Sequence, residues 1–445
     1  MKQVRRFKNT IIFLIALVMY ALCMGALFGL LGIDHFSVIS LSRTSVVMAF
    51  TFIAFGFMLV RTYGNFDIGV RKSRPIVISM SLAMMIDDLA TYLVLIIMNT
   101  NDENGRQIRF SSIGYLLLAM LLQVVIISVM TRLGNAFFFK VTPPDRTLVI
   151  AGNQKEIKKV CAAVGLFDRR YEIKGQAVLP GDNVTDMLKS YDAVFIYDVP
   201  ERERAQLVKE CYRKKISLYC FPYIEDILIH SSDQIMFADL PFYSSEFKGM
   251  TFEQRVAKRL MDIFISAFML LVTSPVLLIA AIAIKKEDGG SVFFRQERAT
   301  IRGRVFKIYK FRTMKENIEN RSVTKDDDRI TGVGKILRKY RIDELPQFIN
   351  IIKGDMSLVG PRPEMLENVE EYTKELPEFS YRLRMKAGLT GYAQVMGRYN
   401  TSSRDKLILD LMYIEDFSIA ADIKLLLQTL TVLFTAEEST EAFDE

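Results

Sequence analysis

The chain is poor in the side chains that carry much of enzyme chemistry. Its 445 residues include two histidines and four cysteines. His35 falls between two apolar runs, and His230 is far in sequence from the acidic motif described below. The cysteines have no metal-ligand spacing, so we expect reduced thiols or small buried apolar side chains. They are Cys23, Cys161, Cys211 and Cys220. These scarcities disfavour a histidine acid–base mechanism and a zinc site, and leave Asp, Glu, Lys or Tyr as nucleophile or base.

A concentrated basic arm is also lacking. The net charge of +7 is spread along the chain. This distribution favours a membrane surface or anionic substrates over nucleic acid as partners.

Long apolar runs, in contrast, are abundant in the first third of the chain. Four of them approach the ~20 residues that cross a bilayer as a helix, and the second is short. They cover residues 11–31, 45–60, 76–98 and 113–130. Basic residues precede the first run, fill the loop between the second and third, and follow the fourth. The positive-inside rule therefore places the N-terminus and everything after the fourth span in the cytoplasm. Buried helices of a large soluble domain are the alternative, and the alternation of charge argues against them.

Two acidic residues, Asp87 and Asp88, interrupt the third run near its middle. A carboxylate there costs about 2.5–3.5 kcal/mol on insertion scales, so both should face other helices or be protonated. Two interpretations stay open: a contact with a lipid substrate, and a polar pair that packs helices together.

After the spans, short apolar runs alternate with charged helical stretches. Strands are expected at 147–151, 193–197 and 216–221, and helices at 154–164 and 201–215. This alternation predicts a small doubly wound α/β module. Gly152 sits where a dinucleotide-binding loop would, but the Gly-x-Gly-x-x-Gly fingerprint is absent. We therefore expect a cofactor-free regulatory or dimerisation module.

A fifth apolar run, 263–284, contains Ser274 and Pro275 at its centre. Proline removes a helical hydrogen bond, so a break or sharp kink is expected there. Basic residues flank the run on both sides, which favours a helix that enters one leaflet and returns to the cytoplasmic face. A full span with a proline kink is the alternative.

The most informative motif is the adjacent pair Asp343 and Glu344, followed by Pro346 and flanked by arginines. A proline in the first turn suits a helix start, whose positive end can hold an anion such as phosphate. Carboxylates beside an anion site suggest a bridging Mg²⁺ ion. Because Pro346 disfavours helical angles at the residue before it, we expect a backbone turn that brings both acids to one site. Alone, the pair would more simply be a solvated or salt-bridged acidic turn.

Later in the chain, Gly388 and Gly391 surround a threonine, which suits close approach of a ligand. The stretch 405–427 is mildly amphipathic and is expected to lie along the membrane surface. The tail 436–445 is acidic, and we expect it to be disordered.

Taken together, the motifs of the C-terminal half resemble those of the bacterial sugar transferases, monotopic phosphoglycosyl transferases that start glycan assembly on a polyprenyl phosphate. The resemblance runs from Phe252 to Thr431. Two departures are visible: Ala387 and Met396 stand where the family usually has Pro and Asn. The matching motifs are Lys258-Arg259-x-x-Asp262, Ser274-Pro275, Val292-Phe-Phe-x-Gln296-x-Arg298, Lys310-Phe311-Arg312-x-Met314, Ile342-Asp-Glu-Leu-Pro-Gln347, Ser357-Leu-Val-Gly-Pro-Arg-Pro363 and Gly388-Leu-Thr-Gly-x-Ala-Gln394.

The resemblance implies a two-step reaction with UDP-sugar as donor and polyprenyl (undecaprenyl) phosphate as acceptor. Asp343 would attack the sugar-bearing phosphate and release UMP, and Glu344 would help to hold Mg²⁺ or handle a proton. Both acids are the expected metal ligands. The residues expected to bind phosphate or substrate are Gln296, Arg298, Lys310, Arg312 and Arg362. Lys258 and Arg259 are expected at the lipid phosphate or the interface.

The predicted architecture is thus membrane α plus α/β. A four-span domain (1–140) precedes a Rossmann-like module (145–245), a mainly α catalytic domain with a re-entrant helix (250–435) and the acidic tail. The resemblance implies that the catalytic domain lies on the cytoplasmic face of the bacterial inner membrane and acts in exopolysaccharide, capsule or O-antigen synthesis. The paired membrane and α/β modules are compatible with a homodimer. Two alternatives remain: direct sugar transfer that releases UDP, and a non-catalytic membrane scaffold.

Overall fold

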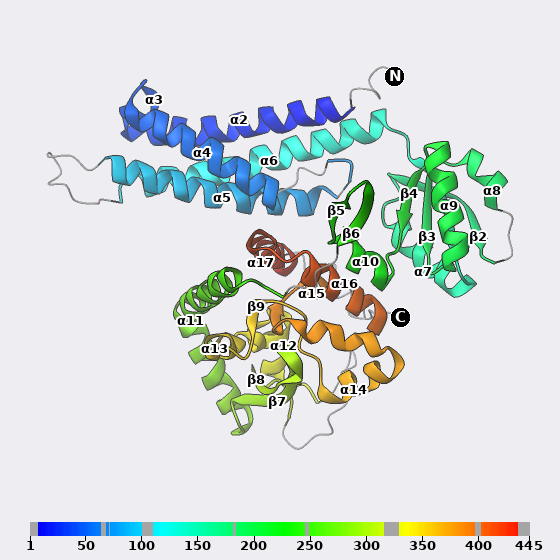
Figure 1. The fold of residues 1–445 in the computed structure, drawn as a ribbon. Coiled ribbons are helices and arrows are strands. Elements are labelled where there is room, and N and C mark those ends of the chain that lie inside the picture. The colour runs from blue at the N-terminus through cyan, green and yellow to red at the C-terminus, as the bar shows by residue number, and fades with distance from the viewer. Residues whose placement is uncertain are drawn as a thin grey trace. The chain divides into compact units, whose positions relative to one another are not determined.

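The computed structural model describes residues 8–63, 68–70, 72–99, 110–180, 184–244, 249–315, 329–396 and 402–434. The expected acidic tail and most of the basic residues ahead of the first span lie outside these ranges. The chain divides into two compact units, Met1–Phe221 and Pro222–Glu445. Each is described by itself below (Figure 1).

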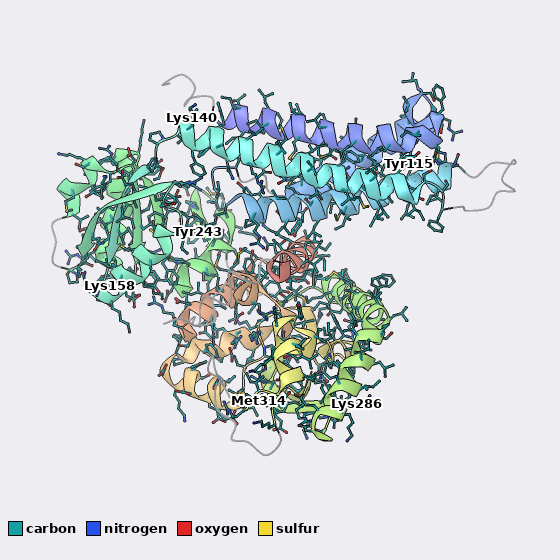
Figure 2. All side chains as sticks on the ribbon, turned by 180° about the vertical axis from the view of Figure 1, so that it is seen from behind. Tyr115, Lys140, Lys158, Tyr243, Lys286 and Met314 are labelled. Carbon is teal, nitrogen blue, oxygen red and sulfur yellow. The ribbon has the colours of Figure 1, made fainter. Side chains whose placement is uncertain are left out.

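The first unit begins with long apolar helices at the four predicted spans. They are α2 (Lys8–Asp34), α4 (Arg43–Thr62), α5 (Ser73–Met98) and α6 (Ile113–Val141), with the short α3 (Phe36–Ile39) after α2. Ser42 begins α4 with a capping box, since its hydroxyl accepts from the Ser45 N–H and its own N–H donates to the Ser45 hydroxyl. The helices pack through one apolar core that includes Leu27, Phe52 and Met84. Tyr115 and Lys140 mark opposite ends of α6 (Figure 2).

The rest of the first unit is a four-stranded parallel sheet in the order β2-β1-β3-β4. Apolar side chains cover both faces: Leu148 and Ile150 of β1 pack with Leu207 of α9, while Val149 packs with Val160 of α7. The doubly wound module is therefore confirmed. A Cβ atom on Gly152 would collide with the Asp198 carbonyl, so a close backbone approach explains this glycine. The elements are β1 (Asp145–Ala151), α7 (Gln154–Gly165), β2 (Tyr171–Val178), α8 (Val184–Met187), η1 (Leu188–Ser190), β3 (Ala193–Tyr197), α9 (Glu201–Lys214) and β4 (Ser217–Cys220).

The second unit is mainly helical, with short two-stranded sheets. Its first part comprises α10 (Ile224–His230), the hairpin β5 (Asp233–Phe237) and β6 (Leu240–Ser244), α11 (Phe252–Asp288), β7 (Phe293–Ala299), η2 (Ile301–Gly303) and β8 (Val305–Phe311). Its second part comprises α12 (Gly332–Lys339), η3 (Ile342–Glu344), α13 (Gln347–Lys353), β9 (Ser357–Val359), α14 (Leu366–Glu375), η4 (Pro377–Arg384), β10 (Gly388–Thr390), α15 (Tyr392–Met396), α16 (Ser403–Glu415) and α17 (Ile419–Phe434). The core that joins these elements contains Ile308, Ile351, Leu358 and Tyr413.

One expectation about this unit is wrong. Gly388 does not make room for a ligand: a Cβ atom there would collide with the backbone of Gly360, because β10 pairs with β9 at close range. The stretch 405–427 is two helices, and its expected place along the membrane surface stays a prediction. It divides into α16 and α17, and the apolar side chains Leu407 and Leu411 of α16 are fully buried.

Helix α11 runs for 37 residues with Pro275 inside it, and its ribbon changes direction along its length (Figure 1). Proline leaves the carbonyl four residues earlier without its usual N–H donor. Here that carbonyl belongs to Leu271, and the Ser274 hydroxyl donates to it at 2.7 Å. The Ser274-Pro275 pair thus bends the helix without leaving a backbone acceptor unpaired. Five helices of the described chain, α11 among them, are long and apolar enough to cross a membrane.

Candidate active site

The acidic pair lies on a tight turn between α12 and α13. Arg341 adopts a left-handed conformation (φ 53°), and the 3₁₀ turn η3 carries both acids. Pro346 then precedes the first residue of α13. Our reason for expecting a turn was wrong, because Leu345 before the proline is helical (φ −57°, ψ −35°). The left-handed residue and the 3₁₀ geometry make the turn instead.

Glu344 is held by cations from three parts of the domain. Lys310 of β8 donates to its Oε1 at 2.8 Å, and Nη2 of Arg362, which follows β9, lies 3.8 Å from the same oxygen. Nη1 of Arg341 is 3.9 Å from Oε2. Burial of this carboxyl acts to raise its pKa, but Lys310 and Arg362 outweigh burial and lower the pKa of Glu344 to about 2. Glu344 is therefore ionised, and its carboxylate holds the three cations around the site.

Asp343 has the opposite electrostatics. Burial and the neighbouring charge of Glu344 raise its pKa to about 6, although Lys310 and Arg338 act to lower it. Two adjacent carboxyls with pKa values pushed apart are typical of groups with different chemical roles. Above pH 6, Asp343 is an ionised carboxylate more basic than an ordinary one, as a nucleophile requires.

Asn350 joins the strand that carries Lys310 to the helix that follows the acids. Its side-chain oxygen accepts from the Tyr309 N–H at 2.9 Å, and its amide donates to the Lys307 carbonyl at 2.8 Å. The side chain is fully buried. Our sequence analysis missed this residue, and the available signal was an amide inside the otherwise apolar stretch from Phe348 to Ile352.

A second buried cluster that the sequence analysis missed holds Arg362. The Arg382 guanidinium donates to the Arg362 carbonyl at 2.7 Å and pairs with Asp410 at 2.7 Å. Lys406 lies 3.3 Å from Glu364, whose carboxylate also faces Arg382 at 3.9 Å. These contacts fix the backbone from which the Arg362 side chain reaches Glu344.

Gln296 and Arg298 of β7 lie beside the Arg362 segment. Arg298 donates to the Gln296 side-chain oxygen at 2.6 Å and to the Pro363 carbonyl at 3.3 Å, while Gln296 contacts the Met365 sulfur at 3.1 Å. Burial and the nearby charge of Arg362 lower the pKa of Arg298, and Glu364 opposes this shift. The two side chains thus line the segment around Arg362 rather than contact the acids.

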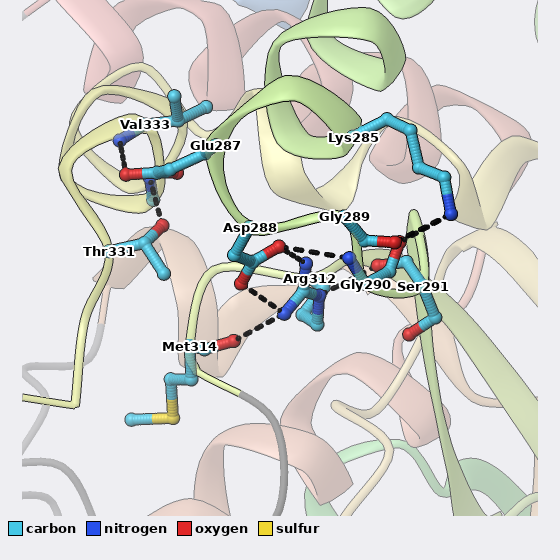
Figure 3. Close-up of polar contacts among 11 residues, drawn as sticks. Lys285, Glu287, Asp288, Gly289, Gly290, Ser291, Arg312, Met314, Thr331 and Val333 are labelled. Atoms are coloured by element: carbon cyan, nitrogen blue, oxygen red, sulfur yellow. Dashed lines mark hydrogen bonds and ion pairs between the residues drawn. The ribbon is translucent and has the colours of Figure 1, made fainter.

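The structure pairs Arg312 with Asp288 at the end of α11 (Figure 3). Its guanidinium binds both carboxylate oxygens of Asp288 and donates from Nε to the Ser291 carbonyl at 2.7 Å. Only 7% of the residue is exposed. Arg312 therefore fastens the C-terminal end of α11 to the end of β8.

The other end of α11 is fastened by Lys258 and Arg259. The buried Lys258 ammonium contacts Asp422, the Tyr413 hydroxyl and, at 3.0 Å, the Val359 carbonyl. Arg259 donates at 2.6 Å to the carbonyls of Ile351 and Ile352 at the end of α13. Both side chains are thus engaged inside the domain.

The carboxylates suit a magnesium ion shared with a substrate. Among the described residues, no group of three or more His, Cys, Asp or Glu side chains could form a complete protein cage for a metal. Mg²⁺ does not need one, because it is commonly bound by one or two carboxylates together with substrate phosphates and water. Asp343 and Glu344, with the cations Lys310 and Arg362 beside them, fit that shared mode.

The geometry therefore defines a membrane-associated domain whose acidic pair is set among cations suited to phosphate. Residues 253–436 match the family model described as bacterial sugar transferase. A UDP-glucose:undecaprenyl-phosphate glucose-1-phosphate transferase of Caulobacter vibrioides is 40% identical over 190 residues, 41% of this chain and 71% of that protein. An uncharacterized sugar transferase of Bacillus subtilis is 37% identical over 183 residues, 41% of this chain and 89% of that protein.

The chain belongs to the bacterial sugar transferase family. A further relative, a UDP-N-acetylgalactosamine-undecaprenyl-phosphate N-acetylgalactosaminephosphotransferase of Aeromonas hydrophila, is 42% identical over 184 residues. That match covers 40% of this chain and 44% of the Aeromonas protein, so it spans less than half of either. The family model covers the part of the chain that holds the acidic pair.

Proposed function

We propose that the protein is an initiating phosphoglycosyl transferase. It would move a sugar-1-phosphate from a UDP-sugar to polyprenyl phosphate and release UMP. The observation that carries this proposal is the pairing of an ionised Glu344, held by Lys310 and Arg362, with an adjacent Asp343 of raised pKa. The names of the Caulobacter and Aeromonas relatives support the same reaction class.

In the first step, a carboxylate oxygen of Asp343 attacks the phosphorus that carries the sugar. An oxygen–phosphorus bond to Asp343 forms, the bond between the two donor phosphates breaks, and the electron pair leaves with UMP. In the second step, a phosphate oxygen of the polyprenyl carrier attacks the same phosphorus and displaces the Asp343 carboxylate. The product is a polyprenyl-diphospho-sugar, and two transfers replace one difficult encounter of anions.

The cations would act by positioning and neutralising phosphate oxygens, which is the main task in phosphoryl transfer. Arg362 is half-exposed and can grip two phosphate oxygens, whereas Lys310 offers a point charge. Mg²⁺, held by Asp343 and Glu344 with the donor phosphates, would supply further charge neutralisation. Arg298 and Gln296 would keep the Arg362 segment in place.

We propose that α11 is re-entrant. A straight helix of 37 residues would be about 55 Å long. Yet Asp262 near its start accepts from the Leu358 N–H, while Asp288 at its end binds Arg312. Both ends thus contact one domain, which argues against crossing the bilayer. Between these anchors lie apolar side chains that are each more than half exposed, namely Phe264, Phe268, Leu271, Val272, Leu278 and Ile279.

This arrangement would seat the acidic pair at the plane of lipid headgroups, where the carrier phosphate lies. We place the catalytic domain on the cytoplasmic face of the inner membrane, where UDP-sugars are available. The α/β module would be regulatory, and exopolysaccharide, capsule or O-antigen synthesis would use the product.

The nucleotide product tests the reaction class. Purified full-length protein in lipid nanodiscs would receive polyprenyl phosphate, Mg²⁺ and each of a panel of UDP-sugars. We expect UMP in an amount equal to that of the lipid product, and we expect no UMP release by Asp343→Asn. UDP as the product would show direct sugar transfer instead, and no nucleotide release with any sugar would point to a scaffold.

A further inference from the structure

Asp87 and Asp88 of α5 are both fully buried within the four-helix bundle of the first unit. Neither has an ion pair among the residues that the structure describes. The groups that face them are Tyr20 and Cys23 of α2, the Phe52 carbonyl and Gly56 of α4, and Gln123 of α6. None of these is a cation, so two charged carboxylates would stand uncompensated in an apolar bundle.

The hydrogen bonds around Asp87 favour a proton on this acid. The Tyr20 hydroxyl has one hydrogen, and it lies 2.5 Å from the Phe52 carbonyl, which can only accept. Oδ2 of Asp87 lies 3.3 Å from the same hydroxyl oxygen. When the hydroxyl donates to the Phe52 carbonyl, a hydrogen bond across this second contact takes its hydrogen from Asp87. The contact also requires a glycine at position 56, because a Cβ atom there would collide with both the Tyr20 hydroxyl and the Asp87 carboxyl.

A similar count applies to Asp88. Both hydrogens of the Gln123 amide are used, one toward the Cys23 carbonyl at 3.1 Å and one toward Oδ1 of Asp88 at 2.9 Å. Oδ2 of Asp88 and Oε1 of Gln123 are left buried without a partner. A proton on Oδ2 of Asp88 would supply a donor where these two buried acceptors have none. Thr91, one helical turn after Asp87, is also buried, and neither its hydroxyl nor Oδ1 of Asp87 has a hydrogen-bond partner among the described residues.

We propose that Asp87 and Asp88 form a buried proton-binding site, in which each holds one proton as a neutral acid. The Tyr20–Asp87 and Asp88–Gln123 pairs then link α5 to α2 and α6 through hydrogen bonds that leave no buried charge uncompensated. The bundle takes up two protons when it packs, because aspartates exposed to water are ionised at neutral pH. Over the pH range in which the buried acids keep protons that water-exposed aspartates have lost, stability falls as pH rises, and the folding equilibrium drops by about tenfold per pH unit for each proton bound.

Infrared spectroscopy of the full chain in lipid nanodiscs tests this site directly, since protonated carboxylic acids have a C=O stretch distinct from that of carboxylates. At neutral pH we expect a protonated-acid band that is partly lost in Asp87→Asn and in Asp88→Asn. Asp34→Asn is the matched control, because Asp34 is an exposed aspartate of the same bundle. It should leave the band unchanged. Spectra of both single variants identical to that of the unmodified protein would overturn the proposal.

The pH dependence of thermal unfolding gives a second test. The Asp87→Asn/Asp88→Asn variant keeps neutral hydrogen-bonding side chains at both positions, so it should lose less stability than the unmodified protein as pH rises above neutral. An equal loss of stability per pH unit in the double variant and the unmodified protein would contradict the proposal. Unfolding is also compared in Na⁺ and choline salts. If Na⁺ stabilises the unmodified protein but not the double variant, and the infrared spectrum shows no protonated-acid band, the site binds an alkali cation and the proposal is overturned.

Discussion

Removing the Lys310 ammonium should shift the pH dependence of the reaction. Lys310 donates to Glu344 at 2.8 Å, and its charge lowers the pKa of both Glu344 and Asp343. In Lys310→Met we expect the pKa of Asp343 to rise from about 6 by on the order of one unit, which corresponds to ~1.4 kcal/mol. Because only ionised Asp343 can attack phosphorus, the acidic limb of kcat/KM should move to higher pH by the same amount.

The assay is UMP release measured across the pH range on both sides of neutrality. Lys353→Met is the control, because it removes an equal charge from α13, where Lys353 donates to the Tyr309 hydroxyl at 3.0 Å. This control should keep the acidic limb of the unmodified protein. The reasoning would be refuted by an unmoved limb in Lys310→Met, or by an equal displacement in both variants.

Further predictions concern stability and the supports of the site. Asp343→Asn should raise the free energy of unfolding at pH 7.5 by about 1–3 kcal/mol, because burial disfavours the charged form of Asp343. This gain in stability should shrink as pH falls through 6. A gain that stays constant with pH would contradict the assigned pKa. Asp410→Asn leaves Arg382 buried with a weakened partner and should destabilise the chain by up to ~3–5 kcal/mol in calorimetry, with a higher KM for the donor. Asn350→Leu removes both bonds to β8 and should cost ~2–4 kcal/mol and lower kcat; unchanged kcat would show that it does not position the site.

The long apolar helices could be predicted from the sequence because a run of some twenty apolar residues has few other stable outcomes. Strands β1, β3 and β4 were similarly visible as short apolar runs. Strand β2 (Tyr171–Val178) was missed, because exposed polar residues alternate along it and interrupt the apolar run.

The contacts of the site were harder to predict than its residues. The acidic pair was evident from its motif, but Arg362 reaches Glu344 only because β9 pairs with β10 and Arg382 holds the intervening backbone. The family resemblance put Arg312 with Lys310 among the residues expected to bind phosphate. The strand ends between them, and Arg312 instead finds Asp288, a partner at the end of another helix that no local pattern indicates.

Intact mass spectrometry of the protein after incubation with a UDP-sugar and Mg²⁺, without lipid acceptor, tests the central claim most directly. The account predicts a sugar-phosphate adduct on Asp343, formed with one equivalent of UMP, lost in Asp343→Asn and discharged by polyprenyl phosphate. Full turnover to UMP and lipid product with Asp343→Asn would contradict the account.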